Sequence, residues 1–369
     1  MNTPSPRTPH SRYERLPIFC IVLYGLALLS LGLYIAFCFS TDFADGFNRT
    51  VAAALRTALS YLTAWIPFSL GELAIWLLPL ALVLVIRHAI RHRCGSWRAA
   101  AVYLGILLSV VSLLFSTFVL TFAAGYRARP LAEKLELQQE DVSKTELYRT
   151  TLLLVEAINA ETEQLSFQKN GFSIMPYSLG EMSEHLSDAY AEVSRTHTFL
   201  PHAAARVKPV VLSEAMSYMH ITGVYSFFTG EANLNVGFPD YTLPATAAHE
   251  LAHQRGVARE DEASFLAFLV CTESDDPYVR YSGYMMAYEY VSAALRRADS
   301  TLYQRAYAKL STEAQGELVA YGRFFEQYRD SVAGDISSSI NNSYLQSQGT
   351  VGVKSYGMVV DLVVAYYRP

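Results

Sequence analysis

The sequence predicts a helical membrane part with three transmembrane helices, followed by a mainly helical α+β domain. Long uncharged runs occupy the first third of the chain, and the rest mixes helical and alternating hydrophobic patterns. Charge is divided in the same way. Residues 1–124 contain nine Arg, no Lys and four acidic residues, whereas residues 125–369 contain 20 basic and 30 acidic ones. The two parts therefore face different surroundings.

Three apolar runs are long enough to cross a bilayer, which takes about 20 residues in a helix. Residues 17–39 and residues 99–124 contain no charged side chain. The run at residues 66–86 includes Pro67 and Glu72 but is apolar afterwards. We predict transmembrane helices at about these three positions. The first is expected to stay as an anchor, because it is too long for a signal peptide.

Basic residues flank these runs unevenly. Residues 1–16 and the loop between the second and third runs carry an excess of Arg, whereas the loop after the first run is balanced. The arginines on the two basic sides are Arg7, Arg12, Arg15, Arg87, Arg91, Arg93 and Arg98. Basic loops stay in the cytoplasm. We therefore expect the tail at residues 1–16 on the cytoplasmic side of the membrane and the domain at residues 125–369 on the outer side.

The beginning of the large domain shows two helical patterns. Residues 125–141 form a polar connector. Ser143 and Glu146 then form a capping-box pattern, in which each side chain satisfies a free backbone amide at the start of a helix. Apolar residues at helical spacing within residues 182–193 predict a second helix. These segments are expected to serve as scaffold.

The last third of the chain is expected to be helical and rich in Tyr. We predict a loop near residues 337–353 and a short apolar segment at residues 359–364 that docks into the core, because it is too short to cross a membrane. Cys271 is the lone cysteine of the large domain, so that domain has no internal disulfide.

Residues 221–236 predict a strand or hairpin. They are rich in aromatic and β-branched residues, are broken by Gly223 and Gly230, and end in an alternating pattern. A free strand edge at this position could pair with an extended peptide. The other interpretation, a hairpin that only supports the core, is equally open.

The most informative motif follows this hairpin and reads His249-Glu250-Leu251-Ala252-His253. Residues four apart lie on one face of a helix, so both imidazoles can bind one zinc ion. Glu250 is then turned to the side, where a general base for a metal-activated water belongs. The alternative is a helix whose two His are ordinary surface or core residues, with Glu250 paired to Arg255.

The third metal ligand is expected to be a carboxylate. Arg259 stands where an extended motif of this type would place another His, and no His follows His253 in the chain. Glu260 and Glu262 are the candidates. A His/His/Glu set with an open position is typical of catalytic zinc sites.

Glu260 is preferred over Glu262 on packing grounds. If residues 258–271 form one helix, the two carboxylates point about 200° apart and cannot both reach one ion. The face of Glu260 continues through small residues, so it can approach the alanine-rich motif helix closely, whereas the face of Glu262 is bulky. Ser264, one turn further on, could hydrogen-bond a ligating His and orient its ring. Glu262 stays open as the alternative ligand.

Several segments resemble DUF3810, a family of uncharacterised bacterial membrane proteins. They are Phe68-Ser-Leu-Gly-Glu72, Thr229-Gly-Glu-Ala-Asn233, Ala248-His-Glu-Leu-Ala-His-Gln254, Arg259-Glu-Asp-Glu-Ala263 and Lys354-Ser-Tyr-Gly357. More distantly, Glu260-x-x-Ala263 is similar to the element that carries the third zinc ligand in gluzincin-type metallopeptidases. That likeness also favours Glu260 and implies a zincin-like domain. The chain departs from it at Ser264, where Asp or Asn is usual.

These patterns lead to the expectation of a membrane-anchored, zinc-dependent metallopeptidase in a bacterial cytoplasmic membrane, acting on peptide or protein substrates outside it. The alternatives are a non-catalytic scaffold or sensor with a structural or inactive metal site, and a zinc amidase acting on cell wall. Glu231 and Asn233 are candidates for the substrate edge. Candidates for stabilising an oxyanion are Tyr225, Tyr284, Tyr288 and Tyr344. Nucleic-acid binding is disfavoured, because the large domain is acidic.

Overall fold

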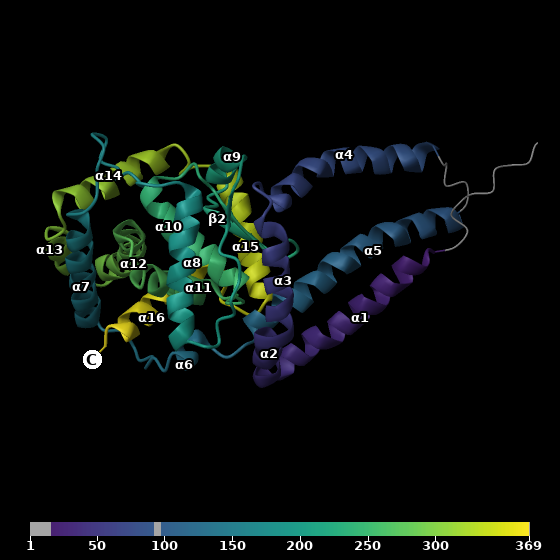
Figure 1. Ribbon diagram of the computed structural model, residues 1–369, viewed down its shortest axis with the longest axis horizontal. Helices are drawn as coiled ribbons and strands as arrows, with labels where there is room; N and C mark the ends of the chain where they lie inside the picture. Colours follow the sequence, from purple (N-terminus) through teal and green to yellow (C-terminus); the bar gives the residue numbers. More distant parts are fainter. Residues whose placement is uncertain (1–15, 92–96, 369) are drawn as a thin grey trace, which may run out of the picture.

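The computed structural model of the chain describes residues 16–91 and 97–368. Among these residues, three helices are long and apolar enough to cross a membrane: α1 (Ile18–Phe39), α4 (Leu70–Arg91) and α5 (Trp97–Thr121). All three extend from the same side of a helical domain (Figure 1). The prediction of three apolar helices is confirmed. Of the arginines used for the expected orientation, Arg7, Arg12, Arg15 and Arg93 lie outside the described residues.

The boundaries of α4 and α5 differ from the prediction. α4 begins at Leu70 rather than at residue 66, because the Ser69 hydroxyl accepts a hydrogen bond from the Glu72 amide at 2.8 Å and so caps the helix there. α5 ends at Thr121 and is followed by the 3-10 helix η2 (Ala123–Tyr126), which is buried. The segment expected to be a polar connector therefore begins inside a buried 3-10 helix.

The segment between α1 and α4 is helical, whereas the sequence had suggested only a loop. It contains α2 (Thr41–Phe47), the π-helix η1 (Asn48–Ala52) and α3 (Ala53–Ala64). The pattern of α3 is inverted: Arg56 and other polar residues are buried, while Leu55 and Leu62 are exposed. A helix that buries its polar side does not show the usual amphipathic signal.

The C-terminal domain, residues 125–369, surrounds a small sheet and a central helix. Its elements are α6 (Leu131–Lys134), α7 (Lys144–Thr162), α8 (Leu179–Thr196), β1 (Val207–Pro209), α9 (Ser213–Tyr218), β2 (Gly223–Ser226), β3 (Glu231–Leu234), η3 (Asp240–Thr242), α10 (Leu243–Gln254), α11 (Glu260–Thr272), α12 (Pro277–Ala298), α13 (Ser300–Tyr307), α14 (Thr312–Glu326), α15 (Val332–Ser347), η4 (Gly352–Met358) and α16 (Val359–Tyr366). In α11, every residue from 262 to 271 is buried. This helix is the centre of the core.

Most of the predicted elements of this domain are present. The capping box of Ser143 and Glu146 opens α7, the second predicted helix is α8, and the apolar residues of the segment 359–364 are buried in α16. The loop expected near residues 337–353 is wrong in its first part, because α15 continues to Ser347. Residues 337–339 are three serines, and a short run of poor helix formers does not end a helix that the fold supports.

The hairpin of β2 and β3 is confirmed, but it belongs to a sheet of three strands. The order is β1-β3-β2, with β1 parallel and β2 antiparallel to β3. The strand just before the motif helix is therefore central and has no free edge. The edge strands of the sheet are β1 and β2, so the free edge of the hairpin belongs to β2.

The two faces of the sheet carry different parts of the protein. Ala232 and Leu234 on β3 are buried on the face that packs on α10. On the other face, Lys208 donates to the carbonyls of Thr63 and Ile66 at the end of α3. The Glu231 carboxylate accepts the amides of Leu70 and Gly71 at the start of α4, at 2.9 and 3.1 Å.

A second carboxylate makes the reciprocal contact between α4 and the domain. Glu72 on α4 accepts the backbone amides of Val211 and Leu212, at 2.9 and 2.7 Å, just before α9. Glu72 therefore lies against the domain and is buried, as suits a charge at the end of an apolar helix. Together with Glu231, it attaches α4 to the sheet.

Replacing Glu231 with Ala should lower the thermal stability of the full chain in detergent. The change leaves two buried amides at the start of α4 without an acceptor, which typically costs about 1–3 kcal/mol. Glu214→Ala, at an exposed position on α9, is the matched control and should melt like the wild type. Equal melting of the two variants would contradict the role given to Glu231.

Glu289 on α12 should make stability depend on pH. Burial raises the pKa of its carboxyl to about 7, although Tyr241 donates a hydrogen bond to it at 3.0 Å. Because the folded state holds the proton more tightly than the unfolded state, stability falls as pH rises from about 4.5 to about 7. Glu289→Gln removes this loss and should raise the melting temperature at pH 8 by roughly 2–4 °C, with a smaller gain at pH 5. Glu313→Gln, at an exposed site, is the control.

Candidate metal centre

Helix α10 places two imidazoles on one face. Its sequence is rich in Ala, it starts with a Pro in the first turn, and nearly all of it is buried. His249 and His253 are four residues apart, and their ring centroids lie 4.7 Å from each other with the rings perpendicular. The helical spacing inferred from the motif therefore holds.

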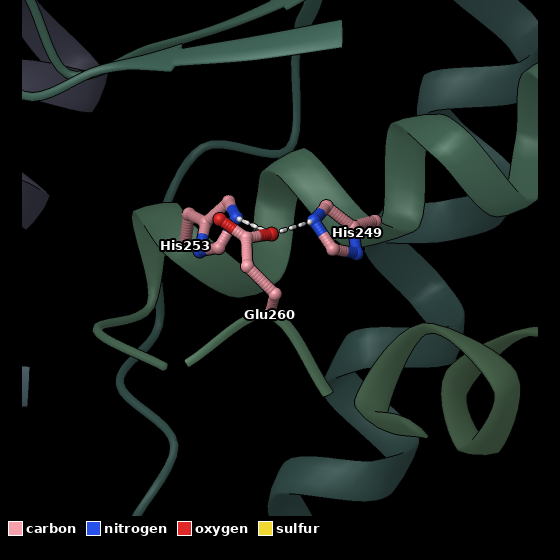
Figure 2. A group of neighbouring side chains, drawn as sticks. All are labelled: His249, His253 and Glu260. Carbon is pink, nitrogen blue, oxygen red and sulfur yellow. Dashed lines mark hydrogen bonds and ion pairs between the residues drawn. The ribbon is translucent and has the colours of Figure 1, made fainter. Parts of the chain in front are cut away.

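The third side chain arrives from the next helix. Gly256, at φ +90°, turns the chain after α10, and Glu260 is the first residue of α11. Its Oε2 lies 3.1 Å from Nε2 of His249 and 3.5 Å from Nε2 of His253 (Figure 2). The three candidate donor atoms all fall within 4.8 Å of one another.

Both rings are oriented by their other nitrogen. Nδ1 of His253 donates to the Val257 carbonyl at 2.8 Å, and Nδ1 of His249 lies 3.2 Å from Oγ of Ser264. Each Nε2 therefore faces Glu260 and can serve as a metal ligand. The contact between Ser264 and His249 is the one that the sequence suggested.

The distances from Glu260 to the two histidines suit a zinc ion. Bonds of about 2.0–2.2 Å in a tetrahedral arrangement require ligand atoms roughly 3.4 Å apart, and the two His–Glu distances are 3.1 and 3.5 Å. Two imidazoles, one carboxylate and no thiolate form the kind of donor set that leaves a fourth position open. Zinc binding at His249, His253 and Glu260 stays a prediction.

Glu262 is directed elsewhere. Its Oε1 accepts the Leu131 amide at 2.8 Å and an Arg259 guanidinium nitrogen at 2.6 Å. The two carboxylates of α11 thus separate as the packing argument expected. Arg255 does not pair with Glu250 either, because it stacks on the Tyr190 ring at 3.7 Å and donates to the Ala203 carbonyl.

Glu250 lies beside the three side chains and against strand β2. It is buried, and a Cβ on Gly223 would lie only 2.6 Å from its Oε1, so a side chain there would displace the carboxylate. Burial raises the pKa of Glu250, and His249 and His253 partly offset the effect, as does a backbone hydrogen bond from Tyr225. A carboxyl with a raised pKa can both accept and return a proton near neutral pH.

His253 and Glu260 strongly change each other's pKa. Burial alone would lower the pKa of His253, but the charge and hydrogen bond of Glu260 raise it to about 9. Burial likewise opposes ionisation of Glu260, yet the His253 charge and the contacts with both histidines hold its pKa well below the usual value. The group therefore already suits a cation, which would replace the histidine proton on binding.

Residues outside the C-terminal domain hold the end of α10. Arg56 on α3 donates to Asn48 Oδ1 and to the Thr121 carbonyl at 2.9 and 2.7 Å, and Asn48 donates to the Gly256 carbonyl at 2.9 Å. A Cβ on Gly256 would collide with Arg56. This contact was not predicted, because Arg56 and Asn48 lie in the segment that had been taken for a loop.

Tyrosines gather around Glu260. The hydroxyl of Tyr126 donates to that of Tyr344 at 3.2 Å, and burial together with the Glu260 charge raises the pKa of Tyr344 to about 12. Burial raises the pKa of Tyr356, and the charges of Glu260 and Glu250 raise it further. It belongs to the segment Lys354-Ser-Tyr-Gly357, so that motif was a signal that could have led to it.

The other expected tyrosines divide between the site and the core. Tyr225 packs against His253 with ring centroids 6.5 Å apart. Tyr284 and Tyr288 lie on α12. Burial raises the pKa of both hydroxyls, as does the charge of Glu161 for Tyr284 and of Tyr303 for Tyr288. These two tyrosines are packing residues.

The expectation for Glu231 and Asn233 as substrate-edge residues is wrong. Glu231 is almost fully buried and binds the start of α4. The side-chain amide of Asn233 donates to the Val224 carbonyl at 3.0 Å, within the sheet. Both residues sit on central strand β3, which has no open edge for a peptide.

The fold and the site together describe a membrane-associated, mostly helical protein with a His/His/Glu group beside a buried carboxylate. The chain belongs to the family described as "Protein of unknown function (DUF3810)", whose model matches residues 47–364. Neither the curated proteins nor the solved structures provide a match to the chain. The matched range includes η1, α3 and the second and third apolar helices.

Ser264→Ala should weaken zinc binding without unfolding the chain. The change removes the group that orients His249, and loss of such a partner typically costs about 10- to 100-fold in metal affinity. Competition with a zinc chelator of known affinity measures the effect. Thr272→Ala, on the same helix and away from the histidines, is the control. Equal zinc affinity in both variants would contradict the orienting role of Ser264.

Proposed function

We propose that this protein is a membrane-anchored, zinc-dependent metallopeptidase. The observation that carries the proposal is the convergence of His249, His253 and Glu260 beside Glu250. A structural metal site would have no use for a buried carboxylate placed next to its ligands. A zinc ion held by these three side chains would supply Lewis acidity and lower the pKa of a water molecule at its open position.

Glu250 acts as the proton carrier in this proposal. It accepts a proton from the attacking water and returns it to the amine that leaves when the peptide bond breaks. Its raised pKa suits both steps. Gly223 allows the carboxylate to lie close to the strand, and the Tyr225 amide fixes its orientation.

Strand β2 offers a place for an extended substrate. Its inner edge pairs with β3, so the backbone amides and carbonyls of Gly223 and Tyr225 point toward the free edge, where the Tyr225 amide already donates to Glu250. That edge lies beside Glu250. A peptide added to it would place its backbone next to the group that moves the proton. We assign to Tyr356, whose pKa is raised by burial and by the charges of Glu260 and Glu250, the role of stabilising the negative charge that develops on the peptide carbonyl.

The proposed location follows from charge. The arginines that flank the apolar helices favour a cytoplasmic tail and a C-terminal domain outside the cytoplasmic membrane of a bacterium. The substrate in this proposal is a peptide or protein outside that membrane, and the bilayer is the second partner of the chain.

Glu250→Gln should keep zinc and lose turnover. Gln fills the same space but cannot accept the proton, so hydrolysis should fall by at least about a hundredfold. The measurement uses the full chain in detergent with zinc and a mixed-sequence peptide library, with products identified by mass spectrometry. Glu262→Gln is the control and should stay active. Full activity of the Glu250 variant, or zinc bound by a wild-type chain that cleaves nothing, would contradict the proposal.

A further inference from the structure

The metal centre lies at the end of an apolar helix. The ring of His253 is 5.8 Å from that of Phe122, the residue that directly follows α5. Phe122 also contacts the ring of Tyr225 on β2 at 5.4 Å. If α5 crosses a bilayer, the candidate ligands are therefore close to the membrane surface.

Strand β2 ends between two of the apolar helices. The hydroxyl of Thr121, the last residue of α5, donates to the Phe227 carbonyl at 3.2 Å. On the other side, a Cβ on Gly71 in the first turn of α4 would lie 3.4 Å from Oγ of Ser226. A polypeptide that extends along β2 past its last residue would thus enter the space between the ends of α4 and α5.

Helix α4 leaves that space open to lipid. Every residue from 73 to 84 is exposed in the isolated chain. α4 meets α5 near the helix ends that lie away from the domain, where the Tyr103 hydroxyl donates to the Val85 carbonyl at 2.8 Å. Toward the domain the two helices separate, whereas α1 stays beside α5 (Figure 1).

Helix α15 continues the apolar surface next to β2. Gly334 near its start lies against His220, which precedes β2, and Leu345 near its end packs in one cluster with Tyr225 and Phe227. The side opposite Gly334 and Leu345 carries an exposed apolar stripe. The stripe consists of Val332, Ile336 and Ile340, with exposed fractions of 71, 56 and 66 %.

The end of α15 joins this stripe to the apolar helices. The Tyr344 ring lies 6.3 Å from that of Phe118 on α5, and the Tyr34 hydroxyl of α1 donates to Gln348 at 3.4 Å. Of the residues of α15, Gly334 and Leu345 are buried and most of the others are exposed, so the stripe lies open beside the ends of the apolar helices.

We propose that the substrate is a polypeptide tethered to the bilayer by an apolar segment or an acyl chain, which reaches the metal centre between α4 and α5 and extends along β2. The inference rests on the proposed function and names its substrate class. Lipid-exposed backbone needs its hydrogen bonds satisfied, and the free edge of β2 supplies partners where such a chain leaves the bilayer. The apolar stripe on α15 contacts the apolar part of the same substrate.

Photo-cross-linking tests this route without requiring turnover. The full chain carrying Glu250→Gln is placed in vesicles of phosphatidylethanolamine and phosphatidylglycerol. A benzophenone amino acid replaces Phe228, which is exposed just after β2, or, as the matched control, Trp65, which is exposed at the end of α3. The probe is a biotinylated, mixed-sequence 16-residue peptide, with or without an N-terminal palmitoyl chain.

The acylated peptide should cross-link to the Phe228 position at least about fivefold more than to the Trp65 position. Tethering raises the concentration of the peptide at the whole membrane surface, and the Trp65 position corrects for that general increase. Equal labelling at the two positions, or equal labelling of the Phe228 position by the soluble peptide, would overturn the inference. Cleavage of the soluble peptide by the wild-type chain, with no preferred labelling, would leave the peptidase standing and sink the tethered substrate. Preferred labelling without cleavage of any peptide by the wild-type chain would support binding of the tethered polypeptide and contradict the peptidase.

Discussion

The attachment of the sheet to the ends of α3 and α4 is the constraint on which the metal centre depends. Lys208 binds carbonyls at the C-terminal end of α3, and Glu231 binds amides at the N-terminal end of α4. Each charge opposes the partial charge of its helix end, and both side chains are buried, where water competes little. Because the opposite face of the sheet packs on α10, strands β1 and β3 together fix the histidines relative to the apolar helices.

A second attachment holds α10 from its other end. Arg56 and Asn48 bind the carbonyls around Gly256, which is also the turn that brings Glu260 back to the histidines. The turn that completes the ligand set is therefore built partly from residues between α1 and α4. The domain that begins at residue 125 supplies the candidate ligands, and the segment between the first two apolar helices holds the turn that joins them.

The sequence was sufficient where chemistry depends on local spacing. The histidines are four residues apart on one helix, and the choice between Glu260 and Glu262 followed from which face of α11 is small. It failed where contacts join distant segments. Glu231 looked like a substrate residue because an exposed strand was expected, and the pairing of β1 with β3 was not visible in the sequence. Arg56 was missed because a buried arginine makes a helix look like a loop.

The measurement that tests the metal centre most directly is the zinc content of the purified full chain, beside Glu260→Ala and Glu262→Gln variants whose folding is checked by thermal melting. The geometry predicts one zinc per wild-type chain, lost in the Glu260 variant and kept in the Glu262 variant, because only Glu260 faces both histidines. A folded wild-type chain without zinc, or loss of zinc only on changing Glu262, would contradict it.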